Sequence, residues 1–90
     1  MNATTTREQA AILDGIREIS TYYGADWAGL SALRDQTQLP REAFDRAMTE
    51  LAVAQVVILA PEDNQKCLTS ADWHNALYVG GEHKHLARIA

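Results

Sequence analysis

The apolar positions in the first quarter of the chain repeat with the period of an α-helix. They recur at spacings of four, three and four residues, which places them on one stripe of a helix: Ile12, Ile16, Ile19 and Tyr23. Thr5 with Glu8, or Thr6 with Gln9, can form a capping box at the start. Gly24 is a natural left-handed stop. The pattern predicts a helix over residues 6–23.

Two more helices are predicted between residues 31 and 54. Ser31 is a suitable N-cap for a short helix over residues 32–37, with Leu33 pointing inward. Pro40 disfavours helical geometry at Leu39 but fits the first turn of a new helix, predicted over residues 40–54. One side of that helix is apolar, and the other side carries Glu42, Asp45, Arg46, Thr49 and Val53.

After residue 55 the sequence pattern changes from that of a helix to that of a strand. Residues 56–59 are apolar and β-branched, which predicts a buried strand. Residues 61–65 have the composition of a turn. We expect residues 66–69 to return as a second strand, so that the two strands form a hairpin, or wing, with a loop of about six residues.

Residues 70–90 are expected to extend this core. Thr69 or Ser70 can cap a short helix over residues 71–77. Residues 80–81 form a glycine turn, and residues 85–89 can form a final strand that buries Leu86 and Ile89. We therefore predict one domain over residues 1–90, with a core at 6–69 and a C-terminal extension at 70–90. Its fold class is mostly α with a small β-hairpin (α+β).

Composition narrows the functional classes. The chain has 8 Lys and Arg against 12 Asp and Glu, a formal net charge of -4, which argues against binding nucleic acid by bulk electrostatics. Its longest uncharged run, 51–61, is too short for a membrane span. The first six residues show no secretory pattern, and Cys67 is the one cysteine. These features favour the reducing cytoplasm.

The order of elements resembles the winged helix-turn-helix superfamily of bacterial and phage DNA-binding domains. The order is helix, short link, short helix, turn, helix, strand, polar loop and strand. The segments that carry the resemblance are 27–34, 39–51 and 56–69. The resemblance implies three helices plus a wing, with the third helix in the major groove and the wing on the backbone or minor groove.

The resemblance also implies a function and a set of contact residues. The function is that of a small sequence-specific transcriptional regulator that binds double-stranded DNA. Arg46 would pair bidentately with guanine and Thr49 would meet a thymine methyl group, while Arg41 and Lys66 would take phosphates. The full set comes from helix 40–54, the turn before it and the wing at 60–66: Gln38, Arg41, Glu42, Asp45, Arg46, Thr49, Asn64, Gln65 and Lys66.

The charges of the proposed recognition helix leave a second function open. Its two arginines stand against three acids, Glu42, Asp45 and Glu50, a sum of -1. Because each phosphate contact needs a cation, we expect a monomer to bind DNA weakly and a dimer to bind better. The alternative is a winged-helix protein–protein interaction module, or an acidic inhibitor or adaptor, that does not bind DNA.

The sequence also suggests a homodimer interface. Closed two-fold dimers are the commonest oligomers, and the candidate interface residues are Tyr22, Tyr23, Trp73, Tyr78 and Leu86. The alternative is that Trp73 and Tyr78 complete the core of a monomer. We expect Trp27 to pack under the second helix.

Four residues invite a metal or catalytic interpretation: Cys67, His74, His83 and His85. The ligand types suit zinc, but His83 and His85 would point to opposite faces of a strand, and no Cys-x-x-Cys or His-x-x-x-His motif accompanies them. A cysteine on a short strand is usually a small core residue. We therefore predict no metal, no cofactor and no enzymatic activity.

Overall fold

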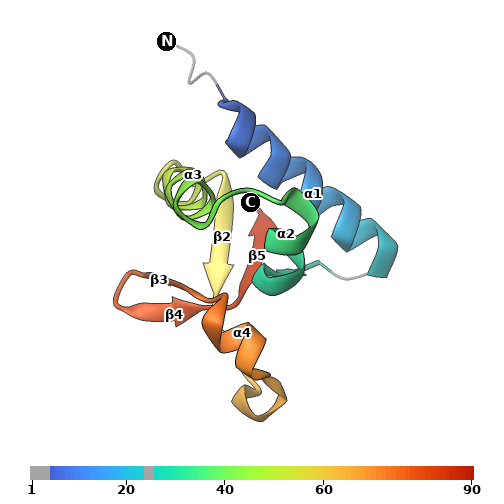
Figure 1. Ribbon diagram of the computed structural model, residues 1–90, viewed down its shortest axis with the longest axis vertical. Coiled ribbons are helices and arrows are strands. Elements are labelled where there is room, and N and C mark those ends of the chain that lie inside the picture. The colour runs from blue at the N-terminus through green and yellow to red at the C-terminus, as the bar shows by residue number, and fades with distance from the viewer. Residues whose placement is uncertain (1–4, 24–25) are drawn as a thin grey trace.

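The computed structural model describes residues 5–23 and 26–90, apart from the side chains of residues 21–23. These residues form a small α+β domain with four α-helices and a three-stranded antiparallel sheet (Figure 1). The first elements are α1 (Arg7–Tyr23), β1 (Ala28–Gly29), α2 (Leu30–Thr37), α3 (Arg41–Val53) and β2 (Val57–Ala60). They are followed by a 3-10 turn η1 (Gln65–Cys67), α4 (Ser70–His74), β3 (Leu77–Val79), β4 (Glu82–Lys84) and β5 (Leu86–Ile89).

The three N-terminal helices confirm the prediction. Of the two capping boxes available to α1, the one that forms joins Thr6 and Gln9. The side-chain oxygen of each residue accepts a hydrogen bond from the backbone N–H of the other, at 3.1–3.2 Å. Helix α2 begins earlier than expected, at Leu30, and its N-cap is Gly29 rather than Ser31. Ser31 instead accepts a hydrogen bond from Asn75. The predicted stop at Gly24 lies outside the described residues.

Helix α3 ends in a Schellman motif. The backbone N–H of Gln55 donates to the carbonyl of Ala52, and that of Val56 donates to the carbonyl of Leu51. Gln55 adopts the left-handed conformation that this motif requires, with φ of 62°. The motif ends the helix abruptly and turns the chain into β2.

The central strand of the sheet is β5. The strand order is β1-β5-β2, and β5 pairs antiparallel with both neighbours. The expected hairpin between 56–59 and 66–69 is therefore wrong, because residues 66–69 form the end of η1 and an extended link instead. In that segment Lys66, Cys67 and Thr69 are exposed and only Leu68 is half-buried, so the segment does not pack into the core. The predicted final strand at 85–89 supplies the missing partner.

Residues 61–85, which we call the insertion, connect β2 to β5. Helix α4 in the insertion is shorter than the predicted 71–77, but its capping by Thr69 is confirmed: Thr69 and Asp72 form a capping box. Residues 77–79 are a strand instead, and β3 pairs with β4 as a hairpin, with Tyr78 opposite His83. The two residues of its turn, Gly80 and Gly81, have φ of 64° and 83°.

The core lies between the sheet and the helices α1, α2 and α3. Its fully buried large side chains come from all three helices: Ile12, Ile16, Leu30, Leu33, Phe44 and Met48. Ala28, Val57 and Ala87 add one buried residue from each strand. Strand β2 is buried on one side only, since Ile58 is 46% exposed. In β5 the buried residue is Ala87, whereas Leu86 and Ile89 are half-buried.

Candidate functional site

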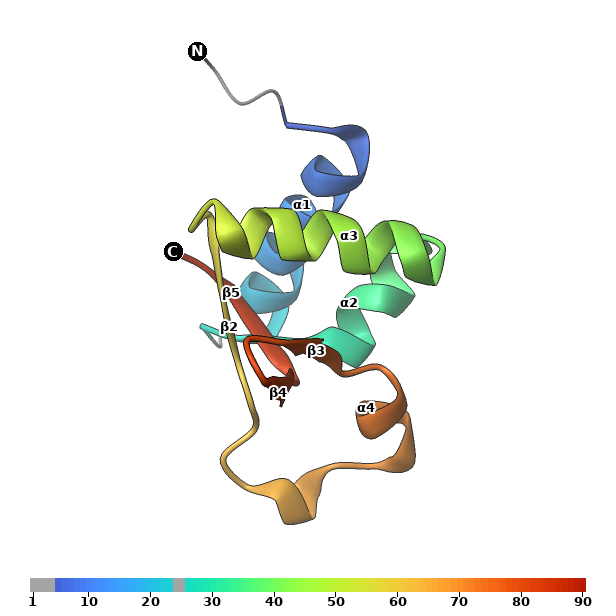
Figure 2. The ribbon, with the colours of Figure 1, turned by 90° about the vertical axis from the view of Figure 1, so that its left-hand side faces the viewer.

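The outer side of α3 and the β3–β4 hairpin lie side by side on one face of the molecule (Figure 2). We call this the α3–hairpin face. A groove of about 580 Å³ runs between the two elements, lined on the α3 side by Asp45, Arg46, Thr49 and Glu50 and on the hairpin side by residues 76–78. Two segments that are far apart in the sequence therefore share one surface.

The structure brings together the predicted site residues of α3. Arg41, Glu42 and Arg46 are exposed, while Asp45 and Thr49 are half-buried. Gln38, the C-cap of α2, is also exposed, and its side chain donates to the carbonyl of Asp35 at 2.7 Å.

The three predicted wing residues lie elsewhere. Asn64, Gln65 and Lys66 belong to or flank η1, which lies at the lower end of the molecule in both views, away from α3 (Figures 1 and 2). Asn64 caps this turn by accepting from the backbone N–H of Lys66 at 3.3 Å. The segment that lies beside α3 is the β3–β4 hairpin, which the sequence pattern did not indicate.

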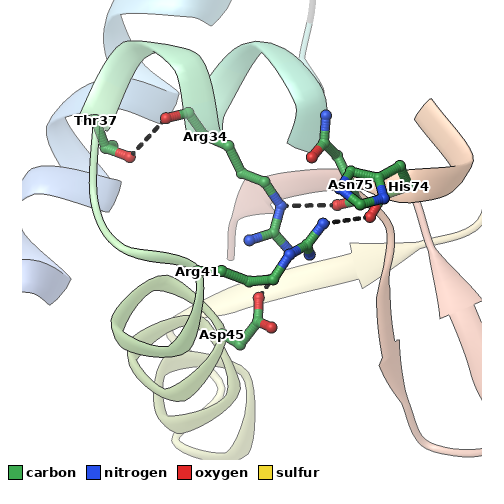
Figure 3. A network of polar contacts seen from close by, with 6 residues as sticks. All are labelled: Arg34, Thr37, Arg41, Asp45, His74 and Asn75. Atoms are coloured by element: carbon green, nitrogen blue, oxygen red, sulfur yellow. Dashed lines mark hydrogen bonds and ion pairs between the residues drawn. The ribbon is translucent and has the colours of Figure 1, made fainter. Parts of the chain in front are cut away.

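Arg34 of α2 is the centre of a polar network under this face (Figure 3). Its side chain is 11% exposed, and its Nη2 lies 2.7 Å from Asp45 Oδ1. Its Nε donates to the carbonyl of Asn75 at 2.9 Å, and its guanidinium lies 4.4 Å from the centre of the Phe44 ring. Arg41 donates to the neighbouring carbonyl of His74. Two guanidinium groups thus satisfy the carbonyls at the end of α4 and fix the insertion against α2 and α3.

This network changes the electrostatics of α3. Because Arg34 neutralises Asp45, the remaining charges on the exposed side of α3 are Arg41 and Arg46 against Glu42 and Glu50, a sum of zero. On the hairpin, Lys84 pairs with Glu82. The α3–hairpin face is therefore close to neutral rather than acidic.

Three aromatic side chains of the insertion form an exposed strip beside this face. The Tyr78 and His83 ring centres are 4.9 Å apart, and those of His83 and Trp73 are 6.2 Å apart, both edge-on. Tyr78 is 63% exposed and Trp73 is 46% exposed. The three side chains are close together because of the β3–β4 register. No local sequence pattern indicates that register, so the strip could not be predicted.

The candidate dimer residues do not form one described patch. Trp73 and Tyr78 belong to the aromatic strip, whereas Leu86 is half-buried in the central strand. The side chains of Tyr22 and Tyr23 lie outside the described residues. Trp27, expected under α2, is half-buried with the Arg88 guanidinium 5.6 Å from its ring centre.

The remaining candidate residues are dispersed. Cys67 is exposed in η1, so its expected place in the core is wrong. His74 and His83 are exposed and His85 is buried. Within residues 5–23 and 26–90, the His, Cys, Asp and Glu side chains do not form a group of three that could hold a metal ion. Over the same residues, no helix has both the length and the apolar character needed to span a bilayer.

Comparison of the chain with protein-family models, curated proteins and solved structures found no match.

Proposed function

We propose that this chain is a winged helix-turn-helix domain that binds double-stranded DNA through the α3–hairpin face. The topology supports the proposal: α1, the short strand β1, α2 and α3 follow one another along the chain, α3 leads directly into β2, and the sheet has the order β1-β5-β2. The observation that carries it is the position of the hairpin alongside the exposed side of α3. In this proposal the wing is the β3–β4 hairpin, not residues 60–66.

The proposed binding mode assigns a role to each exposed cation of α3. Arg46 has no ion-pair or hydrogen-bond partner among the described residues and is free to pair bidentately with guanine in the major groove. Arg41 is already positioned by its bond to His74 and retains other N–H groups for a phosphate. Tyr78 and His83 on the hairpin would contact the flanking backbone.

Few phosphate contacts are available, so affinity should be modest and salt-dependent. Each neutralised phosphate contributes about -0.9 to the slope of log K against log salt. The two cations of this face that are not in an ion pair are Arg41 and Arg46, so we expect a slope of roughly -1 to -2 for a monomer. A closed dimer would double this slope.

Fluorescence anisotropy with a random-sequence duplex pool, followed by selection of a preferred sequence, tests the proposal. We expect binding at about 50 mM salt that falls as salt rises. Arg46→Ala should weaken binding to the preferred sequence by about 1–3 kcal/mol. The control is Arg17→Ala, which removes an exposed arginine of α1 that pairs with Asp14 and should leave binding unchanged. Absence of binding at about 50 mM salt would exclude this function.

A second function is favoured by the composition of the same face. The charges on the exposed side of α3 sum to zero, and the face carries exposed Arg46 and Tyr78, while the adjoining aromatic strip adds Trp73. These are the residue types that dominate protein–protein hot spots. A protein partner would bind with little dependence on salt. Tyr78→Ala would then abolish binding, whereas Arg46→Ala would reduce it without changing its salt dependence.

A further inference from the structure

Strand β2 has one side that is not paired with another strand. It stands at the end of the order β1-β5-β2, so among the described residues its only strand partner is β5. Figure 1 shows β2 on the outside of the sheet, with α3 near its start and the hairpin near its end. A groove of about 500 Å³ opens there, lined by residues of α3, β2 and the hairpin turn. We call this unpaired side of β2, with its groove, the β2 edge.

The backbone of β2 directs four hydrogen-bonding groups to this edge. The carbonyls of Val56 and Ala60 accept hydrogen bonds from the β5 side of the sheet, at 3.0 and 2.9 Å. Because successive residues of a strand direct their backbone groups to opposite sides, Ile58 also faces β5. The N–H and C=O groups of Val57 and Leu59 therefore face away from β5, and within the described part of the chain no strand pairs with them.

The side chains at the β2 edge are apolar and uncharged. Val53 is 76% exposed, Val56 38% and Ile58 46%, and all three belong to the longest uncharged run of the chain, residues 51–61. The charged residue that lines the groove, Lys84, is paired with Glu82. Edge strands that stay unpaired usually carry charges, prolines or bulges that prevent pairing. This edge has none of these over residues 56–60 and is therefore suited to pairing with another neutral strand.

We propose that the β2 edge is a homodimer interface, in which two copies of β2 pair antiparallel about a two-fold axis at Ile58. In this register the N–H and C=O of Val57 bond to those of Leu59 in the second copy, and Leu59 bonds to Val57, so every outward backbone group is used. Ile58 lies opposite Ile58 of the second copy in a non-hydrogen-bonded pair, where the Cα atoms are about 4.5 Å apart. An axis at Leu59 would instead place Val57 opposite Pro61, which has no N–H.

A second copy of the chain fits this edge because the edge is complementary to itself. A two-fold interface joins the same surface of both subunits, and the outward groups of β2 are placed symmetrically about Ile58. The nearest cation on the sheet is Arg88, opposite Ile58 in β5. The two copies of Arg88 would be three strand spacings apart, about 14 Å, which is longer than the screening length of about 8–10 Å. Pairing also stops at two copies, because the remaining edge strand, β1, has only two residues.

The interface is small, so the dimer should be weak. Residues 56–60 of each copy are fewer than the roughly 20–30 residues a side of a standard interface, and we expect a Kd on the order of tens of micromolar. The groove is also lined by Val79 and Gly80 of the hairpin turn, so dimerisation would hold two α3–hairpin faces in one fixed arrangement. This inference holds whether the α3–hairpin face binds DNA or protein.

Sedimentation velocity of the full chain between about 5 and about 500 µM tests the dimer. The mass should rise with concentration from that of one chain, 9.9 kDa, towards twice that value. Ile58→Lys places like charges opposite each other at the axis and should keep the chain monomeric. The control is Tyr78→Lys, which replaces an exposed apolar side chain outside the β2 edge and should leave the dimer intact. A chain that is monomeric at every concentration, or a dimer that only Tyr78→Lys removes, overturns the proposal.

Disulfide cross-linking tests the register, in a chain whose exposed cysteine is removed by Cys67→Ser. With oxidised glutathione, Ile58→Cys should give a covalent dimer, because Cα atoms about 4.5 Å apart are within the range that a disulfide spans. Val56→Cys is the control: it is two residues away on the same face of β2, and its two copies would lie about 13 Å apart along the strands. Equal cross-linking at the two positions, or more at position 56, overturns this register. The cross-link and the mass of the unmodified chain decide the proposal even if Ile58→Lys does not fold.

Discussion

Arg34 and Asp45 form an ion pair that joins α2 to α3, with Nη2 and Oδ1 2.7 Å apart. The pair lies beneath the α3–hairpin face, and the same guanidinium also contacts Phe44 and Asn75. One side chain therefore links α2 and α3 to the insertion.

Arg34→Ala should lower the free energy of unfolding by about 2–4 kcal/mol, because it leaves Asp45 and the Asn75 carbonyl without their donor. Urea denaturation followed by circular dichroism measures this. Arg17→Ala is the matched control, since its pair with Asp14 is exposed, and its effect should stay within about 0.5 kcal/mol. Equal effects of the two substitutions would show that the Arg34 network contributes little.

Gly15→Ala should destabilise the domain although alanine is the better helix former by about 1 kcal/mol. A Cβ at this position would lie 2.7 Å from Cδ1 of Leu33, a fully buried side chain. Overpacking of this kind costs about 1–3 kcal/mol, so the net change should be a loss of up to about 2 kcal/mol. Gly29→Ala is the control, because no atom lies within 4 Å of the added Cβ. A gain in thermal midpoint for Gly15→Ala would contradict the packing.

Gln55→Gly should stabilise the domain by up to about 1 kcal/mol. Gln55 adopts a left-handed backbone conformation, which is unfavourable for a residue with a Cβ atom and not for glycine. The measurement is the denaturation midpoint. The control is Gln65→Gly in η1, because Gln65 does not have a positive φ. Glycine at that position only increases the entropy of the unfolded chain, so it should destabilise the domain. A loss of stability for Gln55→Gly would count against the Schellman geometry.

Gly81→Val should disrupt the β3–β4 turn, whereas Gly81→Asn should be tolerated. A two-residue turn with both φ values positive suits glycine and asparagine and penalises β-branched residues. The valine variant should lose about 1–2 kcal/mol and the cross-strand contact between Tyr78 and His83, which nuclear Overhauser effects would report. Equal spectra for the two variants would rule out this turn.

The elements that could be predicted from the sequence are those with a local signal. The stripe of Ile12, Ile16 and Ile19 and the proline before α3 identify helices within a few residues. The pairing of β2 could not be predicted, because its partner begins at Leu86, beyond 25 intervening residues (61–85). A short polar loop after an apolar strand is the pattern of a hairpin, and nothing local marks the insertion.

The candidate site was predictable to the same extent. Exposure of Arg41, Glu42 and Arg46 follows from the helical period. The neutralisation of Asp45 does not, because its partner Arg34 lies on another helix and is chosen by tertiary packing. The approach of Tyr78 to α3 likewise depends on how the insertion folds back, so a sum of charges along one helix overstated the acidity of the face.

The central position of β5 dictates an order of assembly. Helices α1 to α3 are neighbours in the sequence, so they can associate early. Strands β1 and β2 are not paired with each other, and they are joined only by β5, which is synthesised after both. Closing the intervening segment adds an entropic barrier that grows slowly with its length. Before β5 pairs, the associated helices should leave Val57 and Ala28 without their strand partner. The rate at which residues 86–89 pair with β1 and β2 should then set how long these apolar residues are available for aggregation.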